Sequence, residues 1–114
     1  MNAVCGPGEL AHAVLLRAAA PLDGLELMRQ RRPKAGRDRD LLAGPGRLGQ
    51  AFGADRSLDG DNLVRGALRI VDDGTPPPAR PGVSTRIGLA EGKVDDLPYR
   101  FYVPGDPNVS RPPR

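Results

Sequence analysis

The stretch HAVLLRAAAP, residues 12–21, places a short apolar run directly before a charged side chain and a turn. Its valine and two leucines are typical of a buried strand, and the pattern predicts a strand over residues 11–18. The proline at its end favours a turn. Arg17 closes the apolar run and has two interpretations. It is either an ion-paired cap at the surface end of the strand or a cation held in place for a function.

Two helices are predicted on the C-terminal side of this stretch. The sequence LDGLELMRQR places apolar residues at helical spacing, which predicts a helix over residues 24–31 that Asp23 can cap. Further on, Gly-Pro-Gly at 44–46 precedes a second helical pattern over 47–52, with Pro45 near the first turn, where proline is well tolerated. The chain therefore alternates short helices with irregular segments.

Three further segments have strand character. The residues around 68–71 and the segment 84–92 carry apolar side chains between turn signals, and Tyr99, Phe101 and Val103 recur at period two. The alternation predicts a half-buried strand whose aromatic side chains face the core. Together these elements predict the α+β class: a single domain with an antiparallel or mixed sheet, a few short helices and long loops.

Composition narrows the kind of protein. The chain has 114 residues, which suits one small domain, and its 15 glycines and 13 prolines fit a loop-rich fold. No apolar run approaches the roughly 20 residues of a membrane span, and the N-terminus has no signal-peptide pattern. Cys5 is the only cysteine, so the chain can form neither a disulfide nor a cysteine-based metal site by itself. We expect a cytoplasmic protein without a metal or cofactor.

Positive charge is concentrated in one short segment. The net charge is +3, and the segment from 29 to 39 carries six basic residues opposed only by Asp38: Arg29, Arg31, Arg32, Lys34, Arg37 and Arg39. Such a cluster can neutralise phosphates and bind DNA or RNA in a salt-dependent manner. The alternative is a mobile, solvated loop without a ligand.

Four blocks in order carry a resemblance to a known family. They are AVLLRAAAPLDGLELMRQRR (13–32), RDRDLLAGPGRLGQAFG (37–53), STRIGL (84–89) and YRFYVPGDPNVS (99–110). The chain resembles the C-terminal half of the alkyladenine (3-methyladenine) DNA glycosylases, the type without a helix-hairpin-helix. The resemblance extends over residues 1–110, and residues 111–114 are expected to be a disordered tail.

The resemblance implies an activity and a set of catalytic groups. Enzymes of this family flip an alkylated purine out of duplex DNA, and an activated water then hydrolyses the N-glycosidic bond. Arg17 occupies the place of the arginine that holds this water, and the Ile87 carbonyl that of its second protein partner. Asn2 matches an asparagine that shapes the base pocket, although it could equally belong to a disordered N-terminus.

The resemblance also implies contacts with the DNA backbone. Gly44, Gly46 and Arg47 lie in the segment that meets the backbone, where the family usually has lysine in place of Arg47, and Arg32 matches another arginine that contacts the backbone. Free N–H groups at the start of a helix suit a phosphate. The alternative is that Gly-Pro-Gly merely turns the chain and begins a helix.

The same resemblance implies that essential groups lie outside this sequence. The family's water-activating glutamate, and the residues that stack on the flipped base, belong to the N-terminal half. We therefore expect the chain to be a fragment, or the product of a start assigned at an internal Met, and to be inactive or nearly so alone. The alternatives are a non-catalytic DNA-binding remnant and a chain that does not fold by itself. The expected partner is duplex DNA with alkylated or deaminated purines, bound by a monomer near the bacterial nucleoid.

Overall fold

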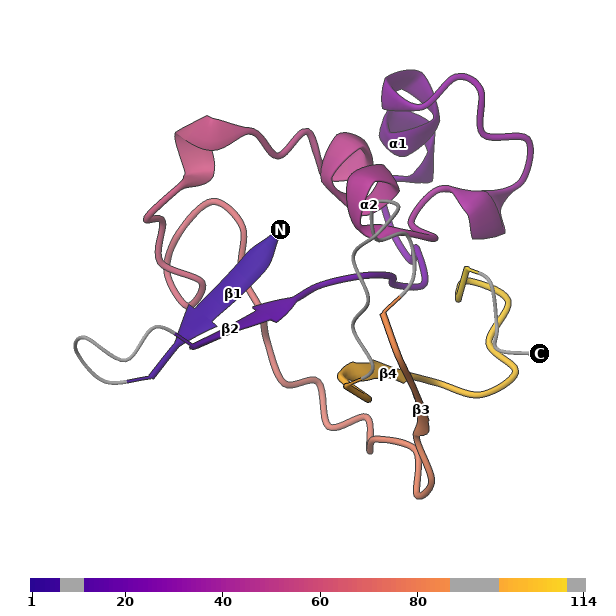
Figure 1. Cartoon of the computed structure of the whole chain (residues 1–114). Coiled ribbons are helices and arrows are strands. Elements are labelled where there is room, and N and C mark those ends of the chain that lie inside the picture. Colours follow the sequence, from indigo (N-terminus) through magenta and orange to yellow (C-terminus); the bar gives the residue numbers. More distant parts are fainter. Residues whose placement is uncertain (7–11, 87–96, 111–114) are drawn as a thin grey trace, which may run out of the picture.

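The fold combines two small sheets with a helical layer (Figure 1). The computed structural model describes residues 1–6, 12–86 and 97–110. In chain order its elements are β1 (Asn2–Cys5), β2 (His12–Leu15), α1 (Leu25–Arg31), η1 (Asp38–Asp40), α2 (Pro45–Phe52), η2 (Arg56–Leu58), β3 (Gly82–Ser84) and β4 (Arg100–Tyr102). The α+β prediction is confirmed. The strands form two separate antiparallel pairs, β1–β2 and β3–β4, where the sequence predicted one sheet.

The first strand pair includes the beginning of the apolar run HAVLLRAAAP, residues 12–21. β2 pairs antiparallel with β1, and Asn2 lies opposite Leu15. The strand prediction is correct in place, but the prediction of burial is wrong, because Val14 is 57% exposed. In the described part of the chain, no third strand pairs with β1 or β2, so their side chains lack the neighbours that bury a strand in a larger sheet.

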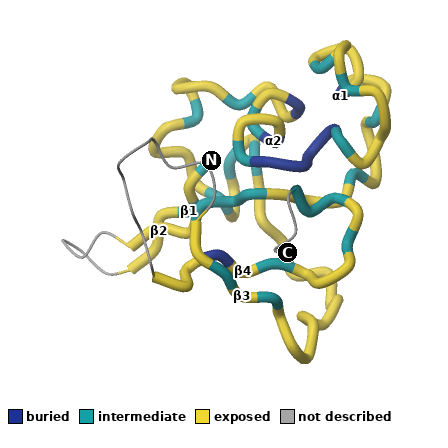
Figure 2. The backbone as a smooth tube through the Cα atoms, turned by 45° about the vertical axis from the view of Figure 1, so that its right-hand side comes forward, coloured by how far each residue is buried: buried dark blue, intermediate teal, exposed yellow. Residues whose placement is uncertain are grey.

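The core lies in the helical layer. α1 and α2 pack against the segment that joins η1 to α2, and Figure 2 shows the buried backbone gathered there, beside α2. The cluster consists of the following apolar side chains: Met28, Leu41, Leu42, Leu48 and Ala51. Pro45 occupies the first turn of α2, as predicted, and Gly53 ends the helix with a φ of 63°, a left-handed conformation that favours glycine. Neither helix in the described residues is long and apolar enough to cross a membrane.

The start of α1 differs from the sequence prediction. The residue that precedes the helix is Gly24, in a left-handed conformation, and no side chain caps the first turn. Capping by Asp23 is therefore wrong. The αL backbone of Gly24 does not present the extended geometry in which a side-chain oxygen reaches the first N–H groups.

The segment after η2 has no strand. The strand expected around 68–71 is wrong, and Val71 is 77% exposed. Asn62 Oδ1 accepts hydrogen bonds from the N–H groups of Val64 (2.8 Å) and Arg65 (3.0 Å). Asparagine side chains that bond their own backbone in this way compete with ladder pairing and favour turns. The local side-chain chemistry thus overrides the apolar pattern.

The second pair inverts the predicted alternation. β4 forms where Tyr99, Phe101 and Val103 alternate, and it ends before Pro104, as expected, but Phe101 is 64% exposed. The other face, with Arg100 and Tyr102, points inward, and Arg100 is only 4% exposed. The strand that was predicted over 84–92 is replaced by β3, which ends at Ser84, and residues 87–96 lie outside the described part. The polar face of this hairpin, not its apolar face, lines the interior.

Gly82 is required where the two strands meet. It lies opposite Tyr102 in the antiparallel register, and a Cβ built on it would lie 2.2 Å from the Tyr102 ring. We expect Gly82→Ala to lower the free energy of unfolding by roughly 1–3 kcal/mol, the usual cost of overpacking. Chemical denaturation followed by circular dichroism measures the change. Gly36→Ala is the matched control, because no atom lies within 4 Å of its added Cβ; an equal loss in both variants would contradict this role.

Candidate functional site

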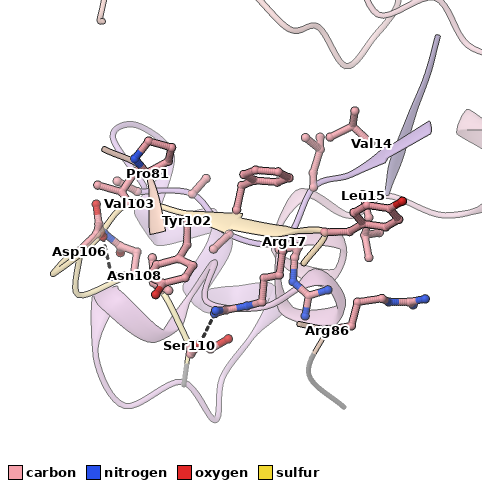
Figure 3. Close-up of a pocket in the computed structure, with 18 of the residues that line it drawn as sticks. Val14, Leu15, Arg17, Pro81, Arg86, Tyr102, Val103, Asp106, Asn108 and Ser110 are labelled. Atoms are coloured by element: carbon pink, nitrogen blue, oxygen red, sulfur yellow. Dashed lines mark hydrogen bonds between the residues drawn. The ribbon is translucent and has the colours of Figure 1, made fainter. Parts of the chain in front are cut away.

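A cavity of about 960 Å³ lies where the end of β2 meets the β3–β4 hairpin (Figure 3). Its walls come from β2 and the residues that follow it, from β4, and from the segment 106–110. Sequence positions more than 80 residues apart thus form one pocket. The polar groups in its wall that bear on chemistry are Asn2, Arg17, Arg86, Tyr99, Arg100, Tyr102, Asp106 and Asn108.

Arg17 is held in this pocket by the backbone on both sides of it. The N–H of Leu16 donates to the Met1 carbonyl (3.0 Å), and the N–H of Ala19 donates to the Leu42 carbonyl (3.3 Å). The second bond ties the segment to the core. The Arg17 side chain is half-buried, and no hydrogen bond or ion pair joins it to any described residue. The interpretation as an ion-paired strand cap therefore finds no partner among the described residues.

Arg100 is the one buried charged side chain among the described residues. Its guanidinium donates to Ser84 Oγ (3.2 Å) and to the Ser110 carbonyl (2.9 Å), and its Cζ lies 4.7 Å from the centre of the Tyr102 ring. All three partners are uncharged. They accept two hydrogen bonds from a group with five N–H donors and do not neutralise its charge.

The positive charges in the pocket affect one another. Burial lowers the pKa of the Arg17 guanidinium, and the positive charges of Arg100 and Arg86 lower it further. An arginine remains protonated at neutral pH even so, because a guanidinium is not deprotonated in proteins under these conditions. The lowered pKa is the signature of a cation surrounded by like charge and partly removed from water.

Asp106 is the only carboxylate of the described residues that lines the pocket. Its Oδ1 accepts hydrogen bonds from the backbone N–H of Asn108 (2.8 Å) and from Asn108 Nδ2 (2.9 Å). Figure 3 places Asp106 and Asn108 together at one end of the pocket, away from Arg17. The carboxylate thus serves a local turn and forms no ion pair with the arginines.

The other two sequence-predicted pocket residues have different outcomes. Asn2 lies in β1, in register with Leu15, so its backbone is ordered by the strand pair, and the residue lines the pocket beside Arg17. This favours the pocket interpretation over a disordered N-terminus. Ile87, predicted to supply a carbonyl to the water, lies outside the described residues, so its role stays a prediction.

The basic segment of residues 29–39 is largely paired within the domain. Arg29 forms a forked ion pair with Asp38, with the shortest contact at 2.8 Å from Nη2 to Oδ1, and Arg37 pairs with Asp40 at 3.0 Å. Arg31 donates to the Ala51 carbonyl (3.0 Å). Neither a mobile, solvated loop nor a fully available cluster of positive charge describes this segment.

The four predicted DNA-contacting positions lie around the start of α2; Gly44 is buried, and Arg32 is half-buried. Arg32 donates to the carbonyls of Asp40 and Leu41, the latter at 2.8 Å. Gly44 precedes α2 with a φ of 145° and no side-chain cap, so the first-turn N–H groups of the helix are not satisfied by a side chain. Gly46 and Arg47 lie in that first turn and are exposed.

Sequence reasoning missed the residues that give the pocket its charge. Arg100 was overlooked because it alternates with aromatic residues, and period two places a charged side chain outward by default. A signal was present in the run YRFYV, since neither face of that strand is purely apolar. Arg86 and Asp106 carry no local pattern, because only the tertiary fold brings them to the pocket.

Comparisons with known proteins identify similar chains. A family model described as methylpurine-DNA glycosylase (MPG) matches residues 1–107. A Burkholderia cenocepacia protein provisionally named 3-methyladenine DNA glycosylase is 50% identical over 111 residues, which are 96% of this chain and 53% of that protein. A Rubrobacter xylanophilus protein of the same name is 45% identical over the whole chain and 57% of its own length. The chain thus spans about half the length of the curated relatives it matches.

Proposed function

Because the chain belongs to the methylpurine-DNA glycosylase family, we propose that it forms the C-terminal half of an enzyme that excises alkylated purines from duplex DNA. The reaction is hydrolysis of the N-glycosidic bond of a flipped nucleotide by an activated water. Flipping costs a few kcal/mol and is easiest at damaged or mispaired bases. The proposed domain is residues 1–110.

The observation that carries this proposal is the position of Arg17. Its backbone is anchored on both sides, its side chain faces a cavity, and no described group pairs with it. A guanidinium presents fixed donors without changing its protonation state, so it can orient a water throughout the reaction. In the proposed site Arg17 holds the attacking water, the Ile87 carbonyl accepts from it, and Asn2 shapes the base pocket.

The proposed DNA surface lies at the start of α2. Gly46 and Arg47 present first-turn N–H groups and one exposed positive charge, which suit a backbone phosphate at the positive end of the helix dipole. Gly44 is itself buried, and we propose that it shapes the turn that places this helix start at the DNA. Arg32 contributes at the edge of this surface, where its guanidinium already holds the Asp40 and Leu41 carbonyls. We infer that its main effect on DNA binding is to fix the segment before α2.

We further propose that these 114 residues alone are inactive or nearly so. Hydrolysis of a glycosidic bond uses a carboxylate beside the reacting carbon, where positive charge develops. The one described carboxylate of the pocket, Asp106, serves a turn with Asn108. The acid that activates the water would then come from elsewhere in a longer protein.

Single-turnover release of hypoxanthine or 3-methyladenine from duplex DNA tests both proposals. We expect no release above background from the chain alone. We expect release from a chimera in which this chain replaces the aligned region of the Burkholderia cenocepacia relative, because the chimera supplies the remaining residues. Robust excision by the chain alone would overturn the proposed inactivity. A folded, DNA-binding chimera without activity would overturn the proposed glycosylase function.

A non-catalytic DNA-binding role is the second candidate, favoured by the exposed first turn of α2. Internal pairing of the basic segment limits how many phosphates the chain can neutralise, since Arg29 and Arg37 are already in ion pairs. We expect Arg47→Gln to weaken binding to undamaged duplex DNA and to reduce the salt dependence of log K by about one contact. Fluorescence anisotropy at several salt concentrations measures the slope. An unchanged slope would remove Arg47 from the DNA surface.

A further inference from the structure

Two arginines that line the pocket, Arg17 and Arg100, form no ion pair with any acidic side chain among residues 1–6, 12–86 and 97–110. Arg100 is 4% exposed and is held by a hydroxyl, a carbonyl and an aromatic face, while Arg17 has no hydrogen-bonded or ion-paired partner among the described residues. A buried charge without an opposite charge is costly. Because the folded chain keeps both positive charges in the pocket wall, an anion that binds there would be stabilised by both guanidinium groups.

We propose that Arg17 and Arg100 form a phosphate-binding subsite within the pocket. Two positive charges that line the same pocket and influence each other favour a ligand with several acceptor oxygens. Guanidinium groups bind phosphate oxygens with paired donors and charge-assisted hydrogen bonds. The phosphate is either a free phosphate ion or a phosphodiester of duplex DNA. Only binding of a DNA phosphodiester rests on the proposed glycosylase function; binding of a free phosphate ion does not.

The surroundings of the two arginines define the subsite. Arg17 is the adjustable partner, half-buried at the end of β2, and Arg100 is the fixed partner, locked between β3 and the Ser110 carbonyl. Asp106 would compete with an anion if it lay close, but Figure 3 places it at the far end of the pocket, where Asn108 holds it.

Titration of the whole chain with inorganic phosphate at constant ionic strength tests the subsite. The side-chain Nε–H resonances of Arg17 and Arg100 report binding, and the melting temperature provides a second readout. We expect saturable shifts of both resonances and a higher Tm. Arg17→Gln should weaken phosphate binding about tenfold or more, the effect of losing a charged hydrogen-bond partner. This variant removes no hydrogen bond within the described fold.

Arg69→Gln is the matched control, because Arg69 is exposed and lies outside the pocket. It makes the same change in charge, so we expect unaltered phosphate binding. Shifts that do not saturate, or an equal loss in Arg17→Gln and Arg69→Gln, would overturn the subsite and leave only nonspecific screening. Since Arg100→Gln could impair folding, Arg100→Lys is the second variant. Lysine keeps the positive charge but lacks the planar, forked donors of the guanidinium, so we expect weaker phosphate binding at an unchanged net charge.

Duplex DNA distinguishes the two sources of the phosphate. Displacement of bound phosphate by an undamaged duplex assigns the subsite to the DNA backbone, whereas simultaneous binding of both assigns it to the free ion. The failures are separable as well. If phosphate does not bind the chain but the chimera releases bases, the subsite is wrong and the glycosylase proposal stands. If phosphate binds the chain but the chimera is inactive, the glycosylase proposal is wrong and the subsite stands.

Discussion

Leu42→Ala is expected to lower the free energy of unfolding by about 2–5 kcal/mol, the range for truncation of a buried leucine. Leu42 is 1% exposed and packs in the cluster between α1 and α2, and its carbonyl accepts the hydrogen bond that ties the Arg17 segment to the core. A domain of this size has a total stability of only roughly 5–15 kcal/mol. The substitution would therefore remove a large part of the stability of the domain, although the backbone hydrogen bond from Ala19 can still form.

Urea denaturation followed by circular dichroism measures the effect. Leu22→Ala is the matched control, since Leu22 is 80% exposed, and we expect its effect to stay within about 0.5 kcal/mol. Comparable losses in the two leucine variants would contradict a core centred on the helical layer. A wild-type chain without a cooperative transition would instead support the interpretation that the chain does not fold alone.

The helices could be predicted from the sequence because their signals are local. The helical spacing of apolar residues located α1, and Pro45 marked the first turn of α2. Both helices bury one face against the same short segment, so pattern and packing agree. The family resemblance, which rests on blocks in order along the chain, is confirmed for the same reason: it needs no knowledge of tertiary contacts.

The strand faces could not be predicted in the same way. Alternation at period two locates a strand but does not say which face has a partner, because that depends on elements distant in the sequence. In β2 the apolar side chains face solvent, and in β4 the inward face carries Arg100. Burial predicted from composition alone fails where a two-stranded pair has little to pack against.

Of the candidate site, the sequence predicted Arg17 and Asn2, and both line the pocket. A charged residue that ends an apolar run is visible in the sequence, and the structure brings it to a pocket. Arg100 reaches that pocket through its strand pairing, and Asp106 through a turn with Asn108. The sequence contains both residues, but their proximity to Arg17 depends on how the two hairpins pack.

Arg17→Gln in the Burkholderia chimera is expected to reduce the single-turnover rate of base release by about 10²–10³-fold, as loss of a positioned donor typically does in an active site. Arg17 has no structural partner among the described residues, so the variant should fold like its parent. A fall in the rate with unchanged stability locates the defect in the chemical step.

Arg17→Lys separates the charge of the side chain from its geometry. Lysine keeps the positive charge but presents a point charge in place of a rigid fork, so a residue that orients a water should tolerate the exchange poorly. We expect a rate between those of the parent and of Arg17→Gln, and an unchanged rate in Arg69→Gln, which alters the same charge on the exposed surface. If Arg17→Gln releases bases as fast as the parent chimera, Arg17 does not hold the attacking water, and the pocket's arginines are left with phosphate binding as their function.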